Sequence, residues 1–318
     1  MRIGLIDVDS HNYPNLCLMK LSAWHKREGD LVEWYDFTQH YDRVYMSKVF
    51  QSSPDYDYVV NADEVVRGGT GYALHGAGGE TYRREDDKPL PEVIEHIMPD
   101  YGLYGINDVA YGFLTRGCPR GCKFCIVGKK EGMCSRKVAD LNEFWEGQKT
   151  IVLNDPNILA CKEWRDLFRQ LEESKAVVDF NQGLDARMLT EEKCLAIDKI
   201  RIKEIHFAWD RYDDKDKILP KLKMFAEISR KKPHEHNAIV YVLVNYHSTL
   251  DQDLERIYTL RDLGYWAYVM IYDKDHAPQV YYDLQRWCNN RIIFAKCKRF
   301  ENYGKKGLIE DKKQLMLF

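Results

Sequence analysis

Three cysteines crowd into the stretch RGCPRGCKFCI, where Cys118, Cys122 and Cys125 follow the spacing C-x3-C-x2-C. Thiolates are soft ligands that favour iron–sulfur clusters, zinc or copper(I). A structural zinc site takes four protein ligands, and the nearest further cysteine, Cys134, lies in a different spacing. A [4Fe–4S] cluster also needs four ligands, so three cysteines would leave one iron open to a substrate or cofactor. The pattern therefore favours an iron–sulfur site with an open iron.

The cysteine stretch follows a predicted strand and contains glycines that suit a compact loop. Gly117 and Gly121 can adopt backbone angles that other residues resist, so the chain can wrap tightly around a bulky cluster. From Asp108 onward, strand and helix patterns alternate in about six βα units. The predicted strands are VAYGFL, KTIVLND, AVVDFNQG, EIHFAWD, AIVYVLVN and YWAYVMIYD, and the predicted helices are DLNEFWEG, CKEWRDLFRQLEES, TEEKCLAIDK, residues 214–231, LDQDLERIYTLRDLG and APQVYYDLQRWC.

The amino-terminal part shows a shorter alternation of the same kind. Its predicted strands are RIGLIDV, LVEWYDF, DRVYMSKVF and EVVRGGTGYAL, and its predicted helix is NLCLMKLSAWHKREGD. Residues 76–105, rich in Gly, Pro, Asp and Tyr, are expected to be a connection without further elements.

These patterns predict an α/β fold with two domains and a tail. Six successive crossovers fit a full or partial (β/α) barrel better than an open sheet. We therefore predict a partial (β/α)6 TIM-like barrel preceded by a small Rossmann-like parallel α/β domain. The boundaries are residues 1–105 for the small domain with its linker, 106–300 for the barrel and 301–318 for a loosely ordered tail. The cysteine loop is expected at the C-terminal end of the first barrel strand, where barrel active sites lie.

Composition narrows the class of protein. The 318 residues are enough for two domains, and a net charge of −3 does not predict a surface that binds polyanions. Nine cysteines spread over this length do not resemble a secreted disulfide framework. The amino terminus lacks signal-peptide features, and no apolar stretch approaches the roughly 20 residues that span a bilayer. We expect a cytoplasmic protein without a membrane partner.

The spacing of the cysteines, the aromatic Phe124 before the third, and the position after the first strand resemble the radical S-adenosylmethionine superfamily. The resemblance covers roughly residues 108–290. It implies that the three cysteines hold a [4Fe–4S] cluster and that S-adenosylmethionine binds the fourth iron, with Phe124 beside the cofactor. The reduced cluster would cleave S-adenosylmethionine to a 5′-deoxyadenosyl radical, which abstracts hydrogen from a substrate.

The resemblance extends to two strand ends with acidic or amide groups. After the second strand, many family members contact the amine of S-adenosylmethionine. Here that segment reads VLNDPN, so Asn154 and Asp155 are candidate cofactor contacts, while the alternative is a simple turn into a helix. The fourth strand ends HFAWD, which makes Asp210 a candidate contact where many relatives carry Gly-x-Glu.

The third strand ends FNQGLDAR, which is similar to the corresponding strand end in the family. Gln182, Asp185 and Arg187 are therefore candidate cofactor-binding residues. Arg187 would meet the carboxylate of S-adenosylmethionine, or it would instead pair with a neighbouring acid on the rim. Asp185 would meet a ribose hydroxyl or the substrate.

The amino-terminal domain resembles a cobalamin-binding domain. Asp9-Ser10-His11-Asn12-Tyr13-Pro14 occupies the place of the family's Asp-x-His-x-x-Gly, in which the histidine is the lower ligand of cobalt. Ser47-x-Val49 and Gly68-Gly69 resemble the two remaining signatures. Because Pro14 replaces glycine and the domain has only about 75 residues before its linker, we favour a domain that kept the fold and lost the cofactor.

The leading interpretation is a radical S-adenosylmethionine enzyme acting on an unidentified small molecule, peptide or RNA, reduced by a flavodoxin or ferredoxin. One alternative is a cobalamin-dependent radical S-adenosylmethionine methyltransferase. A second is a non-catalytic metal- and RNA-binding module, in which basic residues supply phosphate contacts. These residues are Lys123, Lys129, Lys130, Arg136, Lys137, Lys296, Lys298 and Arg299.

Overall fold

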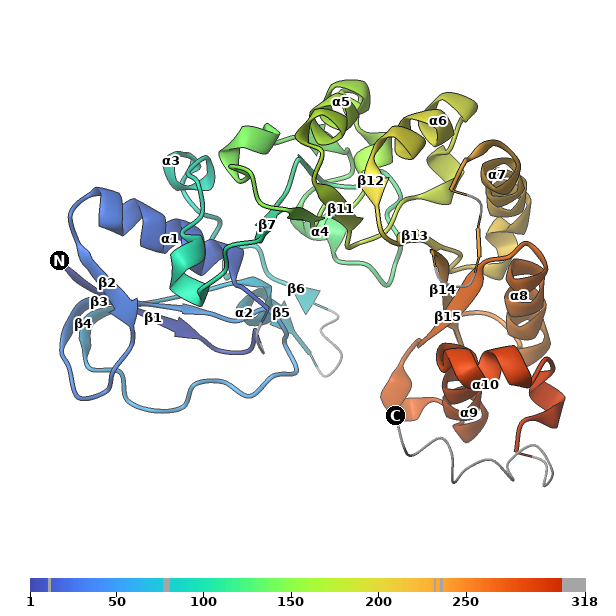
Figure 1. The fold of residues 1–318 in the computed structure, drawn as a ribbon. Helices are drawn as coiled ribbons and strands as arrows, with labels where there is room; N and C mark the ends of the chain where they lie inside the picture. Colours follow the sequence, from blue (N-terminus) through green and yellow to red (C-terminus); the bar gives the residue numbers. More distant parts are fainter. Residues whose placement is uncertain (11–12, 77–80, 232, 235–236, 305–318) are drawn as a thin grey trace. The chain divides into compact units, whose positions relative to one another are not determined.

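The computed structural model describes residues 1–10, 13–76, 81–231, 233–234 and 237–304 (Figure 1). The chain divides into two compact units, one from Met1 to Asn181 and one from Gln182 onward. The sequence-based boundary at residue 105 stays a prediction. A search of the described helices for one of sufficient length and apolarity to cross a membrane found none.

The first unit begins with a parallel sheet of four strands in the order β2-β1-β3-β4. Its elements are β1 (Arg2–Asp7), α1 (Leu16–Arg27), β2 (Leu31–Trp34), β3 (Tyr41–Ser47) and β4 (Ala62–Gly68). The order matches the first four positions of the flavodoxin-like sheet, 2-1-3-4-5. Helix α1 begins at the cap Asn15, whose side chain accepts a hydrogen bond from the Leu18 N–H.

The two faces of this sheet are covered differently. Ile3 and Leu5 pack with Leu18 and Leu21 of α1, as alternation along a strand requires. On the opposite face, the buried residues are Ile6, Tyr41, Val44 and Met46, and side chains from the loops between strands pack against them. The predicted βαβ alternation thus supplies one long helix on one face.

The segment expected to be a plain connection contains short elements, so that expectation was wrong. They are β6 (Thr81–Tyr82), α3 (Glu92–Glu95) and η1 (Tyr101–Tyr104), preceded by α2 (Thr70–Ala73) and β5 (Leu74–His75). Tertiary packing produces them, because Ile94 is buried against the α1 core and the Tyr101 hydroxyl donates to the Phe144 carbonyl at 2.6 Å.

The rest of the first unit contains a second parallel sheet, in which β10 lies between β7 and β11. Its elements are β7 (Val109–Gly112), β8 (Thr115–Arg116), α4 (Val127–Lys130), β9 (Arg136–Lys137), η2 (Leu141–Glu143), β10 (Thr150–Leu153), η3 (Ile158–Ala160), α5 (Trp164–Ser174) and β11 (Val177–Phe180). The helix predicted in DLNEFWEG is only the turn η2. Phe144 leaves the helical path to pack on Gly112, where an added Cβ would lie 2.4 Å from the ring.

The second unit repeats the βα alternation with a parallel sheet in the order β13-β14-β15. Its elements are η4 (Ala186–Met188), α6 (Glu191–Lys199), β12 (Arg201–Ile202), β13 (Ile205–Ala208), η5 (Tyr212–Asp214), α7 (Lys215–Ile228), β14 (Ala238–Val244), α8 (Leu250–Asp262), β15 (Trp266–Ile271), η6 (Lys274–His276), α9 (Gln279–Asn289), α10 (Arg291–Lys296) and η7 (Phe300–Asn302). All six strands predicted after Asp108 are present. The sequence predicts a loosely ordered tail for residues 301–318, and residues 305–318 of that segment lie outside the described part of the chain.

A fully buried ion pair stabilises the strand ends of this second sheet. Arg256 of α8 pairs with Asp253, and both side chains have zero exposure. The Arg256 guanidinium also donates to the carbonyls of Trp209 (2.6 Å) and Leu243 (2.8 Å). Because Trp209 follows β13 and Leu243 lies in β14, this one cation fixes the C-terminal ends of two neighbouring strands.

Replacing Arg256 by Met is expected to lower the free energy of unfolding by about 3 kcal/mol, because Asp253 would keep a buried charge without its partner. Urea unfolding measures the change. The matched control is Arg286→Met, since the Arg286 side chain is 65% exposed and its ion pair with Asp283 contributes little. Equal losses in the two variants would contradict this role.

Candidate functional site

The three cysteines lie in a loop closed by the short antiparallel pair of β8 and β9. The Cys118 N–H donates to the Gly132 carbonyl at 3.1 Å, and the Cys125 N–H donates to the Cys122 carbonyl at 3.0 Å. Gly117 has a φ of +86°, and a Cβ there would lie 2.2 Å from the Cys134 carbonyl oxygen. Only glycine fits this close approach, in agreement with the predicted tight loop.

The three thiols of this loop are the predicted ligands of a [4Fe–4S] cluster. Cys118, Cys122 and Cys125 are each partly exposed and free of disulfides. Within the described residues, no group of three or more His, Cys, Asp or Glu side chains is arranged to hold one metal ion. In a [4Fe–4S] cube each thiolate binds a different iron, so the three sulfurs need not converge on one point. The donor set and the glycine-rich loop therefore fit a cluster.

Asp155 anchors the strand that leads into the cysteine loop. Its buried carboxylate accepts hydrogen bonds from the Thr115 N–H (2.5 Å), the Thr115 hydroxyl (2.6 Å) and the Leu114 N–H (3.1 Å). Burial raises the pKa of Asp155 to about 6, against the lowering effect of these donors. The contacts in the structure are thus to the chain itself, while a cofactor contact stays a prediction.

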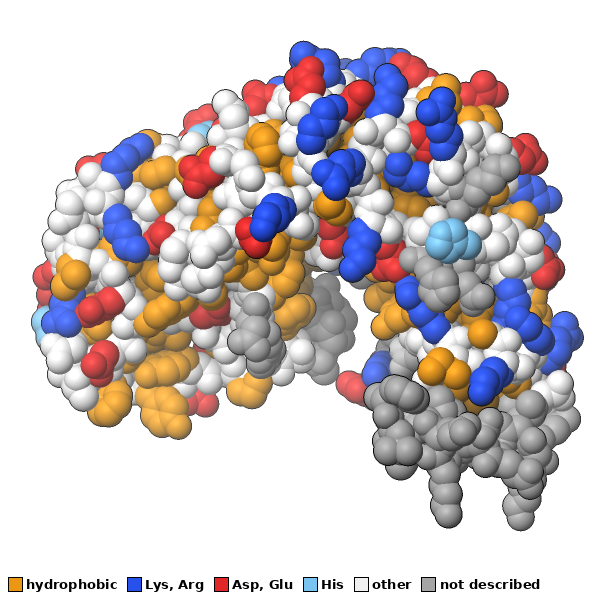
Figure 2. All heavy atoms as spheres, in the orientation of Figure 1, with side chains coloured by type: hydrophobic (Ala, Val, Ile, Leu, Met, Phe, Trp, Pro, Cys, Tyr) orange, Lys and Arg blue, Asp and Glu red, His pale blue; other side chains and the backbone are white. Residues whose placement is uncertain are grey.

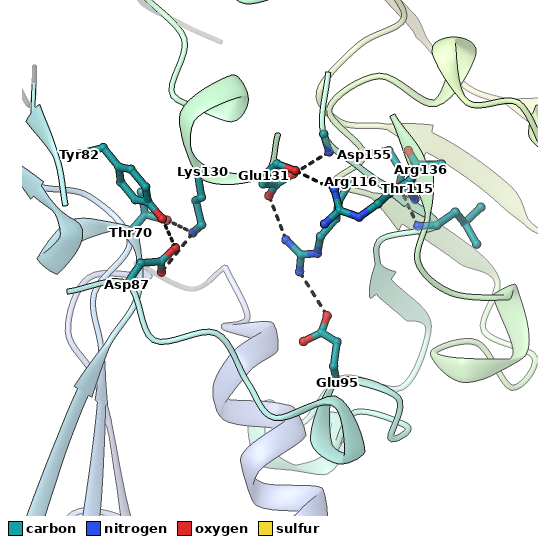
Figure 3. A network of polar contacts seen from close by, with 12 residues as sticks. Thr70, Tyr82, Asp87, Glu95, Thr115, Arg116, Lys130, Glu131, Arg136 and Asp155 are labelled. Carbon is teal, nitrogen blue, oxygen red and sulfur yellow. Dashed lines mark hydrogen bonds and ion pairs between the residues drawn. The ribbon is translucent and has the colours of Figure 1, made fainter. Parts of the chain in front are cut away.

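Glu131 closes the base of the loop from the other side (Figure 3). Its carboxylate accepts from the Gly117 N–H at 3.1 Å and pairs with the Arg116 guanidinium at 3.0 Å. Arg116 also reaches Glu95 of α3 at 3.3 Å, and Arg136 donates to the Glu131 carbonyl at 2.7 Å. The loop is therefore fixed at both ends by charge-assisted hydrogen bonds.

Lys130 ties the helix inside the cysteine loop to the segment that follows β4 (Figure 3). Its ammonium donates to the Thr70 hydroxyl at 2.5 Å and lies 3.9 Å from Asp87, which accepts from the Tyr82 hydroxyl at 2.6 Å. Lys130 is a phosphate contact in the RNA-binding alternative, whereas the sequence analysis does not predict a role for Glu131 or Arg116. In the sequence, these two residues stand out only by carrying opposite charges at the two ends of the cysteine loop.

Tyr13 connects the amino-terminal sheet with the barrel-type strands of the same unit. Its hydroxyl donates to Asn154 Oδ1 at 3.2 Å and accepts from Asn181 Nδ2 at 3.4 Å. Its ring packs edge-on against Tyr111, with centroids 5.2 Å apart. Asn154, a predicted cofactor contact, thus lies beside the loop that carries the cobalamin-like signature. Asn157, two residues after Asp155, donates to the Cys118 sulfur at 3.4 Å.

The second unit holds the remaining predicted cofactor residues. Arg187 pairs with Asp185 at 2.7 Å and with Asp214 at 3.5 Å, which is the acid-pairing alternative considered for it. Burial raises the pKa of Asp210 to about 6, opposed by the nearby Arg187 and Arg256 cations. The structure thus groups Asp185, Arg187 and Asp210 electrostatically. Gln182 is exposed, and Phe124 of the cysteine loop is 37% exposed. Cofactor contacts for all of these stay predictions.

The cobalamin-like signatures converge at the C-terminal ends of β1, β3 and β4. The Asp9 carboxylate accepts from the Val49 N–H (2.8 Å) and the Phe50 N–H (2.7 Å), which joins the first two signatures. Gly69 has a φ of +101°, and a Cβ there would lie 2.3 Å from the Lys48 carbonyl oxygen. His11, the predicted cobalt ligand, lies outside the described residues. In flavodoxin-like sheets, the ends of β1 and β3 form the ligand-binding switch point.

Three observations at this switch point test the fit of cobalamin. The Ser10 hydroxyl is buried without a hydrogen-bond partner among the described residues. The Ser47 hydroxyl accepts from Asn15 at 2.8 Å and can still donate its own proton. Among the described residues, a Cβ added at Gly68 would meet only the Lys88 carbonyl, at 4.0 Å, so open space within this part of the chain adjoins the end of β4. Polar donors beside open space fit a bound nucleotide-like tail.

Of the remaining cysteines, Cys134 is exposed and Cys17 is partly exposed, while the others are buried in the packed interior of their own units. Cys194 in α6 and Cys288 in α9 are fully buried, and burial raises the pKa of Cys194 to about 11. Cys161 is buried too. The sequence predicts that Cys161 begins a helix, but in the structure it ends the turn η3, and α5 begins only at Trp164. These buried cysteines pack as small apolar groups.

No protein-family model matches this chain, and no curated protein does. Solved structures do. The radical S-adenosylmethionine methyltransferase TsrM from Kitasatospora setae, with cobalamin and a [4Fe–4S] cluster bound, aligns over 85% of this chain and 74% of its own, with a TM-score of 0.59 and 10% identity. The cobalamin-dependent S-adenosylmethionine radical enzyme OxsB, with aqua-cobalamin and S-adenosylmethionine bound, aligns over 92% of this chain and 56% of its own, with a TM-score of 0.53 and 13% identity.

The predicted fold class is confirmed: the chain is a mixed α/β protein with parallel sheets, similar in fold to these radical S-adenosylmethionine enzymes. Cobalamin is bound in both of these neighbouring structures.

Replacing Asp155 by Ala is expected to destabilise the protein by about 2 kcal/mol or more, because two buried N–H groups would lose their acceptor. The variant should also retain less iron after reconstitution, since β8 leads directly into the cysteine loop. Urea unfolding and iron content measure the two effects. The matched control, Glu173→Ala, removes an exposed carboxylate from α5 and should keep its iron. Unchanged iron in the Asp155 variant would contradict the anchoring role.

Proposed function

We propose that this chain is a cobalamin-dependent radical S-adenosylmethionine enzyme and that it transfers a methyl group. The observation that carries the proposal is the convergence of two kinds of loop in one compact unit. One is the three-cysteine loop after β8, and the other is the set of three signatures at the ends of β1, β3 and β4.

The cysteine loop would hold the cluster through Cys118, Cys122 and Cys125. When bound, a [4Fe–4S] cluster with one open iron supplies the electron that cleaves S-adenosylmethionine. Asn157 would donate a hydrogen bond to the Cys118 sulfur, as its amide does at 3.4 Å. Hydrogen bonds to ligating sulfurs raise the reduction potential of a cluster, so Asn157 would make it easier to reduce. A flavodoxin or ferredoxin would supply the electron.

Each unit, taken by itself, offers polar side chains at its strand ends as proposed contacts of S-adenosylmethionine. Asn154 and Asn181 follow β10 and β11, and their amides contact each other at 2.9 Å. Asp185 and Arg187 offer a paired acid and cation that suit a ribose and a carboxylate. Asp210, with its pKa raised to about 6, is a group that can carry a proton near neutral pH.

Cobalamin would lie against the ends of β1, β3 and β4, where it would supply a cobalt centre that carries the methyl group. Ser10, Ser47 and Gly68 would line its tail. The shortness of the domain and Pro14 led the sequence analysis to favour loss of this cofactor. The strand order and the fold neighbours support its retention, and the two views differ in a measurable way.

Cys122→Ala is expected to abolish formation of 5′-deoxyadenosine and methionine from S-adenosylmethionine by the reduced protein, because the cluster loses one of its three ligands. Wild type, reconstituted without oxygen, should bind about four irons. Cys134→Ala is the matched control, since Cys134 is exposed and outside the motif, and it should keep both properties. Wild type that holds a full cluster yet forms no 5′-deoxyadenosine would overturn the radical mechanism.

Wild type mixed with hydroxocobalamin should retain about one corrinoid per chain after desalting, measured by absorbance. Gly68→Leu should reduce this retention, because the leucine side chain would extend into the open space that cobalamin would occupy. The backbone of Gly68 does not have a positive φ, so leucine can be accommodated there without backbone strain. Val59→Leu, at a 92% exposed position, is the control that should bind normally. If wild type retains none, the cobalamin part of the proposal is wrong, while the 5′-deoxyadenosine test still decides the radical part.

A further inference from the structure

Strand β4 forms an open edge of the amino-terminal sheet. Among the described strands it pairs only with β3, so the fifth position of a flavodoxin-like order, next to β4, is open. The side chains along it are exposed: Asp63 by 68%, Glu64 by 52% and the whole of Val65 by 37%. Exposed edge strands readily pair with another strand unless a protein blocks them.

The peptide groups that face outward follow from the pairing with β3. The Gly68 carbonyl accepts from the Lys48 N–H at 3.0 Å, so the peptide groups of Gly68 face β3. Peptide groups alternate in direction along a regular strand, so those of Val65 and Arg67 face away from β3. The alternation does not reach Asp63, because the Asn61 carbonyl accepts from the Tyr41 N–H at 3.1 Å and the register shows no partner for Asp63 on β3. Val65 and Arg67 therefore present donors and acceptors at the open edge.

The sequence of this edge is complementary to itself in antiparallel register. In ADEVVRG, pairing centred on Val65 places Val65 opposite Val65 of a second copy and Asp63 opposite its Arg67. The register places the outward-facing Val65 opposite its counterpart in the second copy, as a hydrogen-bonded antiparallel pair requires. Opposite charges directly across such a pair are stabilising, and like charges are destabilising.

Exposed apolar side chains lie on both edge strands of this sheet and in its loops, and of those between residues 31 and 65, Val65 is the one on β4. The exposed large apolar side chains of residues 31–65 are Leu31, Trp34, Phe37, Val49, Phe50, Tyr58, Val59 and Val65. Figure 2 shows hydrophobic side chains gathered over this part of the first unit, which is blue in Figure 1. Val65 lies on the same face as the buried Val44 and Met46, so a second copy would extend that apolar face across the edge.

We propose that two copies of this chain pair through β4, antiparallel and centred on Val65, to form one continuous sheet. Each dimer then contains two Asp63–Arg67 pairs because of its two-fold symmetry. Within one chain, Asp63 lies 3.2 Å from His40 and Arg67 contacts the Tyr72 hydroxyl. The Asp63–His40 pair is more than half exposed on both sides and contributes little, so it does not prevent pairing between copies.

The test uses the full chain and charge reversal, with the mass in solution measured by light scattering or sedimentation. Wild type should be a dimer at micromolar concentration. Asp63→Arg or Arg67→Asp each places two pairs of like charges across the edge, and each should weaken dimerisation by about tenfold or more. Asp213→Arg, a reversal at a 78% exposed position in the second unit, should leave the dimer unchanged.

Two restorations make the test specific. The double variant D63R/R67D again matches opposite charges and should dimerise like wild type. A mixture of the D63R and R67D variants should form a heterodimer, because one edge then carries two arginines and the other two aspartates. Monomeric wild type would overturn the proposal. So would a dimer insensitive to both reversals, or single variants that neither the double change nor mixing restores. The outcome does not depend on the cofactors, so it is separable from the tests of function.

Discussion

A buried carboxylate at the end of β10 determines how the cysteine-bearing region is built. Taking Asp155 out of water is costly, and three donors from Leu114 and Thr115 offset that cost. These bonds join the end of one parallel strand to the start of β8, which leads into the cysteine loop. The position of the cysteines therefore depends on a residue that lies about thirty positions further along the chain.

The charged frame around the loop has a second consequence. Arg116 and Lys130 extend from the loop to Glu95 and Thr70, which belong to the segment between the amino-terminal sheet and the barrel-type strands. Tyr13 adds a contact from the loop after β1 to Asn154 and Asn181. These contacts explain why the first compact unit reaches Asn181 and includes both the amino-terminal sheet and the cysteine loop.

In the second unit, acidic and basic groups are placed by buried polar bonds in a similar way. Arg256 donates to the carbonyls of Trp209 and Leu243 and so fixes the C-terminal ends of β13 and β14. Asp210 directly follows Trp209 in the sequence. Asp185 and Asp214 both contact Arg187, which lowers the cost of holding two carboxylates close together. The strand ends of this unit thus carry pre-arranged charges.

The sequence by itself determined the spacing of Cys118, Cys122 and Cys125, from which a cluster site is predicted, and the order of most strands and helices. Ligand spacing and hydrophobic periodicity are local properties, so they can be read from the chain. The helix expected in DLNEFWEG was lost to the packing of Phe144 on Gly112, and the segment after residue 76 gained short elements. Only the tertiary structure decided the roles of Asp155, Glu131 and Arg116, and it left β4 as an open edge. Each of these depends on partners distant in the sequence, and burial and pairing between distant residues are fixed only when the chain folds.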